Sequence, residues 1–321
     1  ILKNSEIKKE PDFEAIDNYL TYQYVPHPRT GFLSIKKLPP AHYMIVKETG
    51  EVEMKRYWKL NFAEKWELSE KEWEEKIIEK LREAVRLRLI SDVPLGAHLS
   101  GGIDSSTIVA FMSMESREPV KTFSIGFKEA EYNELPYAKL VAEKYKTNHR
   151  EFIVEPKAID VLEKLAYFYE EPYADSSALP TWYLAEKTKQ YVTVALNGDG
   201  GDENFAGYTR YNAMKLYYQL RQIPLKILFA KLSKILYQTT RMRIFQKGYR
   251  FFSSFSQNPI DSFLRIISAF SQEEKDLIYS PEFKKRAKNF PWRLYIEEKF
   301  KEAENLDKID KLLFVDINSN L

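Results

Sequence analysis

The sequence predicts an α/β fold: a doubly wound parallel sheet with a helical C-terminal extension and a small β-rich N-terminal segment. Two observations lead to this prediction. Short apolar strands alternate with stretches of helical periodicity between residues 93 and 196, a pattern typical of parallel sheets with crossover helices. In addition, glycine-rich loops follow the first and the last of these strands, at the sheet edge where doubly wound folds bind ligands.

The first 60 residues carry strand and turn signals. Prolines at 26, 28, 39 and 40 interrupt this stretch, and apolar runs at 42–46 and 51–57 flank a Thr49-Gly50 turn, as in a hairpin. We therefore expect a hairpin-rich appendage. The chain begins with Ile1 instead of Met, which indicates a fragment or a processed product.

The central region justifies the sheet element by element. A helix should begin after Ser69, because Ser69 and Glu72 form a capping box and apolar residues then recur at helical spacing. Strands are expected at 93–99, 120–127, 151–154 and 191–196, and helices at 105–115, 134–146 and 157–189, the last broken near Glu171-Pro172. The run at 191–196 is almost continuously apolar, so we expect it to be buried on both faces.

Beyond Tyr208 the sequence becomes aromatic-rich and helical, with turns expected near Pro224, Pro259, Pro281 and Pro291. The tyrosines at 208, 211, 217 and 218 have near-helical spacing and are expected in a core. The predicted domains are therefore residues 1–66, 67–222 and 223–321.

Composition narrows the class of protein. The net charge is +2, which gives no reason to expect a nucleic-acid or membrane partner. No apolar run approaches the roughly 20 residues that span a bilayer. The absence of cysteine excludes thiolate chemistry within these residues and favours a reducing, cytoplasmic location.

A phosphate-binding loop is the first candidate site. Ser100-Gly101-Gly102-Ile103-Asp104-Ser105-Ser106 follows an apolar strand and opens a helix. Two glycines allow backbone N–H groups to close around an anion, and serines at a helix N-terminus can face phosphate oxygens. A carboxylate here would repel phosphate unless a cation lay between them, so Asp104 is interpreted as a magnesium ligand. The alternative is an ordinary capped turn.

An acidic glycine loop is the second candidate. Asn197-Gly198-Asp199-Gly200-Gly201-Asp202-Glu203 follows the strand at 191–196, so it should lie at the same sheet edge. Three carboxylates within five residues repel one another unless a cation binds or one pKa is raised. The alternative interpretation is a solvated acidic turn.

These motifs resemble those of a known family. The first resembles the pyrophosphate loop of the ATP pyrophosphatase group, and residues 196–208 resemble the signature of the glutamine-hydrolysing asparagine synthetases. Residues 121–127 resemble that family's adenosine-contacting strand, residues 170–180 the stretch beside its amino-acid pocket, and residues 19–59 the last strands of its glutaminase domain. The resemblance implies ATP and Mg²⁺ as cofactors, and cleavage of ATP between its α- and β-phosphates.

The resemblance also implies a role for each matching residue. The pyrophosphate would be held by Ser100, Gly101, Gly102, Asp104, Ser105 and Ser106, and magnesium by Asp104 and Asp202. The adenosine site would be lined by His98, Leu99, Ser124, Ile125, Gly126, Asn197 and Gly198, where Asn197 replaces the more usual serine. The catalytic residues would be Asp199, Asp202 and Glu203, and the amino-acid substrate would lie near Asp175, Ser176 and Ser177.

The implied activity is adenylation of the aspartate side-chain carboxylate, followed by amidation with ammonia derived from glutamine. A homodimer is one possible oligomeric state of the protein. The family's glutaminase uses an N-terminal cysteine, which is absent here, and a pyrophosphate-facing lysine is expected beyond residue 321. We therefore expect this chain by itself to have little or no synthetase activity.

Two alternatives stay open from the sequence. One keeps the chemistry and changes the acceptor: a related amidotransferase or amide-forming cyclase that acts on another carboxylate. The other is a non-catalytic relative that binds ATP for regulation or assembly. Pyrophosphate release would distinguish the second from the first.

Overall fold

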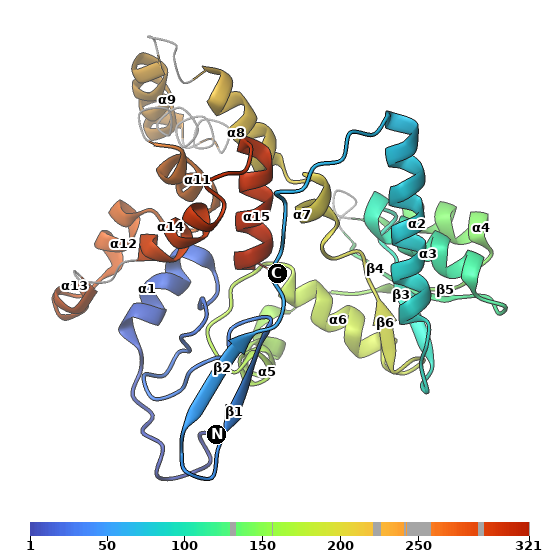
Figure 1. Ribbon diagram of the computed structural model, residues 1–321, viewed down its shortest axis with the longest axis horizontal. Helices are drawn as coiled ribbons and strands as arrows, with labels where there is room; N and C mark the ends of the chain where they lie inside the picture. The colour runs from blue at the N-terminus through green and yellow to red at the C-terminus, as the bar shows by residue number, and fades with distance from the viewer. Residues whose placement is uncertain are drawn as a thin grey trace. The chain divides into compact units, whose positions relative to one another are not determined.

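The computed structural model describes residues 1–128, 133–155, 157–220, 226–240, 242, 258–287 and 292–320. The chain divides into two compact units (Figure 1). Unit 1 comprises Ile1–Glu64, Tyr169–Ala174 and Asp202–Leu321, and unit 2 comprises Lys65–Phe168 and Asp175–Gly201. The predicted division into three domains stays a prediction, and each unit is described by itself.

Unit 2 contains a parallel sheet of four strands. These are β3 (Leu95–His98), β4 (Lys121–Gly126), β5 (Asn148–Ile153) and β6 (Val194–Leu196). Their order is β5-β4-β3-β6, and every neighbouring pair is parallel. The chain therefore leaves β3 towards one edge and returns to its other side, so the strand order reverses between β3 and β6. The predicted α/β fold with a parallel sheet is confirmed.

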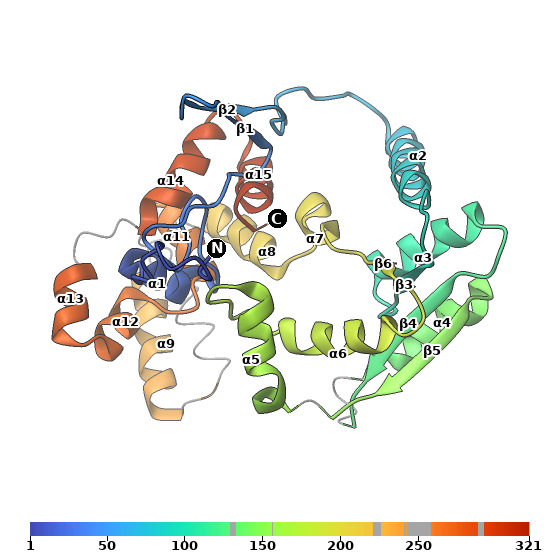
Figure 2. The same cartoon turned by 90° about the horizontal axis from the view of Figure 1, so that it is seen from below.

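Helices lie on both faces of this sheet. One face is covered by α2 (Glu70–Arg88), α3 (Ile103–Glu115) and α4 (Leu135–Tyr145), which share an apolar core with residues of β3. On the other side, α6 (Ala178–Thr188) packs against β4 (Figures 1 and 2). The capping box predicted at Ser69 and Glu72 is present at the start of α2. The predicted break in the helical stretch before β6 separates α5 (Ala158–Tyr169) from α6.

The predicted burial of residues 191–196 on both faces is wrong. Only the last three residues form β6, and Val194 is 42% exposed, because β6 is an edge strand of the described sheet. The apolar character of residues 191–196 comes partly from Tyr191 and Val192, which precede the strand and pack against other residues. Val192 is buried, and the Tyr191 ring stacks on Phe123 and Phe152.

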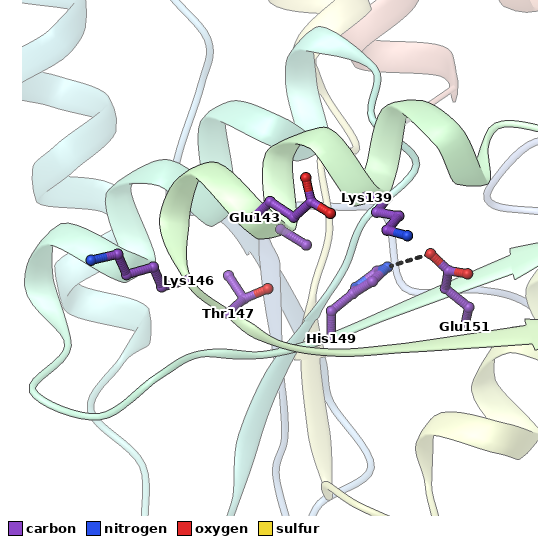
Figure 3. Close-up of a pocket in the computed structure, with 7 residues that line it drawn as sticks. Lys139, Glu143, Lys146, Thr147, His149 and Glu151 are labelled. Atoms are coloured by element: carbon purple, nitrogen blue, oxygen red, sulfur yellow. Dashed lines mark ion pairs between the residues drawn. The ribbon is translucent and has the colours of Figure 1, made fainter.

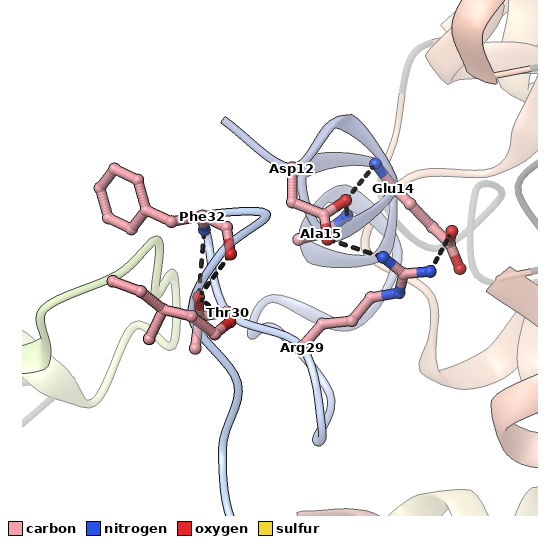
Figure 4. A network of polar contacts seen from close by, with 7 residues as sticks. Asp12, Glu14, Ala15, Arg29, Thr30 and Phe32 are labelled. Atoms are coloured by element: carbon pink, nitrogen blue, oxygen red, sulfur yellow. Dashed lines mark hydrogen bonds and ion pairs between the residues drawn. The ribbon is translucent and has the colours of Figure 1, made fainter. Parts of the chain in front are cut away.

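Unit 1 begins with a helix that the sequence patterns do not predict. Strand and turn signals dominate the first 60 residues, but α1 spans Phe13–Tyr22. The Asp12 side chain caps it by accepting hydrogen bonds from the N–H groups of Glu14 and Ala15. Arg29 then binds Asp12 at 2.7 Å and Glu14 at 2.5 Å (Figure 4). The expected hairpin is present as β1 (His42–Val46) and β2 (Val52–Arg56), paired antiparallel.

The later part of unit 1 is helical, as predicted. The helices are α7 (Gly201–Phe205, which starts in unit 2), α8 (Thr209–Leu220), α9 (Lys226–Thr240), α11 (Pro259–Ile267), α12 (Gln272–Ile278), α13 (Pro281–Ala287), α14 (Trp292–Glu302) and α15 (Lys308–Asn320). Pro259 and Pro281 occupy first helical positions, where proline is favoured. The turns predicted near Pro224 and Pro291 lie outside the described residues. None of the helices in the described ranges combines the length with the hydropathy that crossing a bilayer requires.

The two ends of the chain share the core of unit 1. Tyr22 belongs to the same buried cluster as residues of α8, α11, α14 and α15, and its hydroxyl donates to the Trp292 carbonyl at 2.5 Å. The Lys275 ammonium donates to the Asp17 carboxylate at 2.8 Å, and both side chains are buried. The N-terminal segment is therefore packed with the C-terminal helices of this unit.

A half-buried histidine, His27, makes the stability of unit 1 depend on pH. The His27 ring contacts the Tyr295 ring edge-on, and burial, with nearby lysines, lowers the His27 pKa from 6.5 to about 4. The unfolded chain therefore takes up its proton first as the pH falls. We expect the free energy of unfolding to decrease as the pH is lowered from 6.5 to about 4. Above pH 6.5, His27 should add nothing to the pH dependence of this free energy. Urea denaturation over a pH series should show a smaller decrease for His27→Gln, and an equal decrease would contradict the assignment.

Candidate functional site at the reversal of strand order

The loop after β3 has a defined conformation. Gly101 has φ +84°, and a Cβ there would lie 2.5 Å from the Ala138 nitrogen, so only glycine fits between the loop and the start of α4. The Ser100 hydroxyl is 2.9 Å from the Ser105 hydroxyl and accepts a hydrogen bond from the Gly102 N–H. The loop is thus preformed by its own side chains.

The N-terminus of α3 faces this loop. Gly102 is the N-cap and provides no side-chain hydrogen bond to the first turn, so the first N–H groups of α3 lack a side-chain cap. The Ser106 hydroxyl oxygen is buried and has no hydrogen-bond partner among the described residues. Uncapped helix N–H groups and an unsatisfied buried hydroxyl are suited to phosphate oxygens.

The loop after β6 is a tight turn. The Asn197 amide donates to Asp199 Oδ2 at 2.6 Å, and the Asp199 N–H donates back to Asn197 Oδ1 at 3.3 Å. The Gly201 N–H donates to the Gly198 carbonyl at 3.2 Å. These bonds keep the loop close to the end of the strand.

The two loops meet inside unit 2. A Cβ at Gly198 would lie 2.7 Å from the Ser105 nitrogen, and a Cβ at Gly201 would lie 2.5 Å from Asp104 Cγ. Both glycines therefore let the backbone of the acidic loop approach the first turn of α3. This meeting point is where the strand order reverses, between β3 and β6, the position at which open α/β sheets bind ligands.

The residues predicted for adenosine come from three places: His98 and Leu99 at the end of β3, residues 124–126 on β4, and Asn197 and Gly198 in the loop after β6. The His98 Nε2 atom is buried with no hydrogen-bond partner among the described residues, and burial lowers the His98 pKa although the nearby Asp199 carboxylate raises it. The Ser124 hydroxyl donates to the Leu99 carbonyl, so it joins the two strands. Gly126 packs against Leu135. Leu99 is buried and Ile125 partly buried, and a nucleotide contact for any of these residues stays a prediction.

The three residues predicted beside the amino-acid substrate are exposed at the start of α6. Asp175 accepts a hydrogen bond from the Ser177 N–H at 2.7 Å, which gives it a local structural function. A ligand function for Asp175, Ser176 and Ser177 stays a prediction.

The remaining carboxylates of the acidic loop belong to unit 1. Asp202 follows Gly201 directly, and its carbonyl accepts the Gly207 N–H at 2.9 Å. Glu203 is 5% exposed and accepts a hydrogen bond from the Tyr208 hydroxyl at 2.8 Å. Burial, followed by this hydrogen bond, raises the Tyr208 pKa. The sequence spacing places Tyr208 in a core and gives no sign of its contact with Glu203.

Asp104 at the phosphate loop is a carboxylate of the kind that binds magnesium, and a shared magnesium ion with Asp202 stays a prediction. No group of three or more His, Asp or Glu residues in the described parts of the chain forms a metal centre. Magnesium, however, is usually held by one or two carboxylates, with water and substrate phosphates completing the shell. Asp104 provides such a carboxylate at the phosphate loop, against a glycine that leaves space for it. This donor set is the kind that magnesium takes beside a nucleotide.

A separate pocket of about 460 Å³ lies between α4 and β5 (Figure 3). Its lining includes Lys139, Glu143, Lys146 and His149. The His149 Nδ1 atom is 2.9 Å from the Thr122 hydroxyl, and burial lowers the pKa of the ring. No residue of either loop lines this pocket, and its mixed charges favour no ligand class.

Comparison with known proteins places both loops within a region that matches a family model. Residues 76–321 match the family model described as asparagine synthase, and residues 1–58 match the model described as a glutamine amidotransferase domain. A protein named asparagine synthetase (glutamine-hydrolyzing) 1 from Bacillus subtilis strain 168 is 30% identical, over 97% of this chain and 48% of its own length.

Two further relatives are informative. A putative asparagine synthetase (glutamine-hydrolyzing) from Methanocaldococcus jannaschii is 34% identical over 72% of this chain and 46% of its own length. A protein named amidase chry2 from Gibberella zeae is 30% identical over 58% of this chain and 31% of its own length. The chain thus spans about half the length of the first relatives it matches.

Proposed function

Because this chain belongs to the asparagine synthase family, we propose that the protein activates the side-chain carboxylate of aspartate with ATP and converts it to an amide. The carboxylate oxygen attacks the α-phosphorus, and pyrophosphate leaves, which gives an acyl adenylate. Ammonia then attacks the acyl carbon, and AMP leaves with the oxygen that the carboxylate contributed. The products are asparagine, AMP and pyrophosphate.

One observation supports this proposal most directly. The acidic loop lies against the first turn of α3 through Gly198 and Gly201, so it adjoins the phosphate loop where the strand order reverses. A phosphate loop alone would support only nucleotide binding. An acidic loop at the same position supplies a second group of side chains for the acyl and ammonia steps.

In this proposal the protein acts by orientation and by charge. The N–H groups at the start of α3, with Ser105 and Ser106, bind pyrophosphate oxygens. The β3 and β4 ends hold the adenosine, and Asp199 orients the adenylate for attack by ammonia. Holding two reactants at the reacting distance converts a bimolecular step into an effectively unimolecular one.

Magnesium would be held by Asp104 and Asp202, and when bound it neutralises charge on the phosphates. Asp202 follows Gly201, so its Cα is about 3.8 Å from that of the glycine that contacts Asp104. Residues 1–58 match an amidotransferase domain, which favours glutamine as the source of ammonia in the full natural length of the protein.

We expect pyrophosphate release that depends on aspartate. The protein in its full natural length should release AMP and pyrophosphate from Mg-ATP when aspartate is present, and should form asparagine when ammonium is added. Trapping of the adenylate with hydroxylamine would report the first step alone. An ATP analogue with a methylene group between the α- and β-phosphorus should support neither product.

Other outcomes decide between the alternatives. One relative carries a name other than asparagine synthetase, amidase chry2, so the second candidate, amide formation on another carboxylate, is tested by including glutamate, a sugar acid and a short peptide in the assay. Release with one of these and not with aspartate would reassign the acceptor. Release of ADP and phosphate would contradict adenylation, and no release with any carboxylate would leave only an ATP-binding module.

A further inference from the structure

Glu203 is connected to the distant helix α15 by a chain of side-chain contacts, all within unit 1. The Tyr208 hydroxyl donates to Glu203 Oε1 at 2.8 Å. The guanidinium carbon of Arg210 lies 3.8 Å from the centroid of the Tyr208 ring. Arg210 Nε in turn donates to Asp316 Oδ2 at 2.8 Å. Asp316 lies on α15, 106 residues after Arg210 in the chain.

The burial of these groups makes the arrangement costly. Asp316 is fully buried and Glu203 is 5% exposed. Burial raises the Asp316 pKa, with Arg210 acting in the opposite direction and Glu203 adding repulsion. A buried carboxylate–guanidinium pair, with a second buried carboxylate that repels the first, is a poor means of stabilising a fold, because apolar residues of similar volume usually do as well or better. The charges are therefore better explained by what they hold in place.

The geometry is suited to holding the acidic loop. Tyr208 binds one carboxylate oxygen of Glu203, and Arg210 covers a face of the Tyr208 ring, a favourable cation–π contact. Asp316 fixes the guanidinium, and its own helix is anchored by its core residues Leu312 and Val315. Tyr208 holds Glu203, which is next to Asp202, directly. Arg210 and Asp316 hold Glu203 only through Tyr208.

We propose that Tyr208, Arg210 and Asp316 are positioning residues, through which α15 holds Glu203 and the acidic loop in the arrangement that amide formation requires. This inference rests on the proposed function for its kinetic consequence. Its structural consequence, a loop ordered from α15, does not depend on which carboxylate is the acceptor.

The test compares Tyr208→Phe and Asp316→Asn with a matched control, Asp261→Asn. Asp261 also pairs with an arginine, Arg293, in unit 1, and belongs to neither loop. Three quantities are measured on the protein in its full natural length: kcat for amide formation with ammonium, the KM for ATP in that reaction, and the backbone hydrogen exchange of residues 199–207. Tyr208→Phe removes a single oxygen, so it keeps the test valid if Asp316→Asn folds poorly.

We expect both network variants to lower kcat 10- to 100-fold, to change the KM for ATP less than threefold, and to accelerate exchange in residues 199–207 at least tenfold. The control, Asp261→Asn, should change none of these three quantities. A lower melting temperature with unchanged kcat and unchanged exchange would overturn the inference and leave a stability function. If the unmodified protein activates no carboxylate, the proposed function fails, and the exchange measurement still decides whether α15 orders the loop.

Discussion

Replacing Gly201 by alanine should abolish most of the activity and leave the fold nearly intact. The new Cβ would lie 2.5 Å from Asp104 Cγ and 2.6 and 2.8 Å from its two oxygens, closer than any unstrained contact. Either the Asp104 carboxylate or the acidic loop must move. A displacement of about 1 Å at a reacting centre costs about 10²-fold in rate, whereas inserting one methyl group costs about 1–3 kcal/mol of stability.

The measurement is kcat for pyrophosphate release, together with the melting temperature. Gly50→Ala is the matched control: Gly50 has a positive φ, but a Cβ added there would have no atom within 4 Å. That substitution should cost about 1–2 kcal/mol through backbone conformation alone and leave the rate unchanged. If Gly201→Ala released pyrophosphate at the normal rate, the two loops would not act as one site.

Replacing Asp104 by asparagine should have a similarly large effect for a different reason. The variant keeps the size of the side chain and removes its charge, so the proposed magnesium ligand is lost. We expect pyrophosphate release to fall about 10²- to 10³-fold, the range seen when one charge-stabilising group is removed from an active site. The concentration of Mg²⁺ needed for half-maximal rate should increase.

Asp104 is also an acidic residue in the first turn of α3, which stabilises a helix by about 0.3–1 kcal/mol. The control must therefore remove such a charge elsewhere. Asp160→Asn does so, because Asp160 is in the first turn of α5 and exposed. It should leave the rate and the magnesium requirement unchanged. An Asp104→Asn variant with an unaltered magnesium requirement would refute the ligand assignment.

The sequence predicted the sheet well because its elements are marked locally. Alternating strand and helix signals located all four strands, and the capping box at Ser69 located the start of α2. The same local signals missed α1, because the prolines and glycines of the N-terminal region outweighed a ten-residue helix whose cap is Asp12. They also misjudged residues 191–196, because an edge position depends on strand order, which no single strand reveals.

For the candidate site, too, the sequence predicts the local motifs and not the contacts between distant residues. The loops were visible as motifs, but the contact between them depends on Gly198 and Gly201 meeting α3, which is a matter of distance in space. The spacing of Tyr208 correctly indicated packing against the core of unit 1. It contained nothing about the hydrogen bond to Glu203, and the Arg210–Asp316 pair joins residues 106 positions apart.

The discontinuity of unit 1 has a consequence for biosynthesis. Its N-terminal segment binds partners that the ribosome makes much later: the Tyr24 hydroxyl donates to the Ser319 carbonyl, 295 residues along the chain. Closing so long a loop is slow, and contacts of high sequence separation slow folding. All residues of unit 2 precede Asp202, so they are synthesised before the C-terminal helices of unit 1. Tyr22 and Tyr24 therefore lack these partners until residues 292–319 have been synthesised.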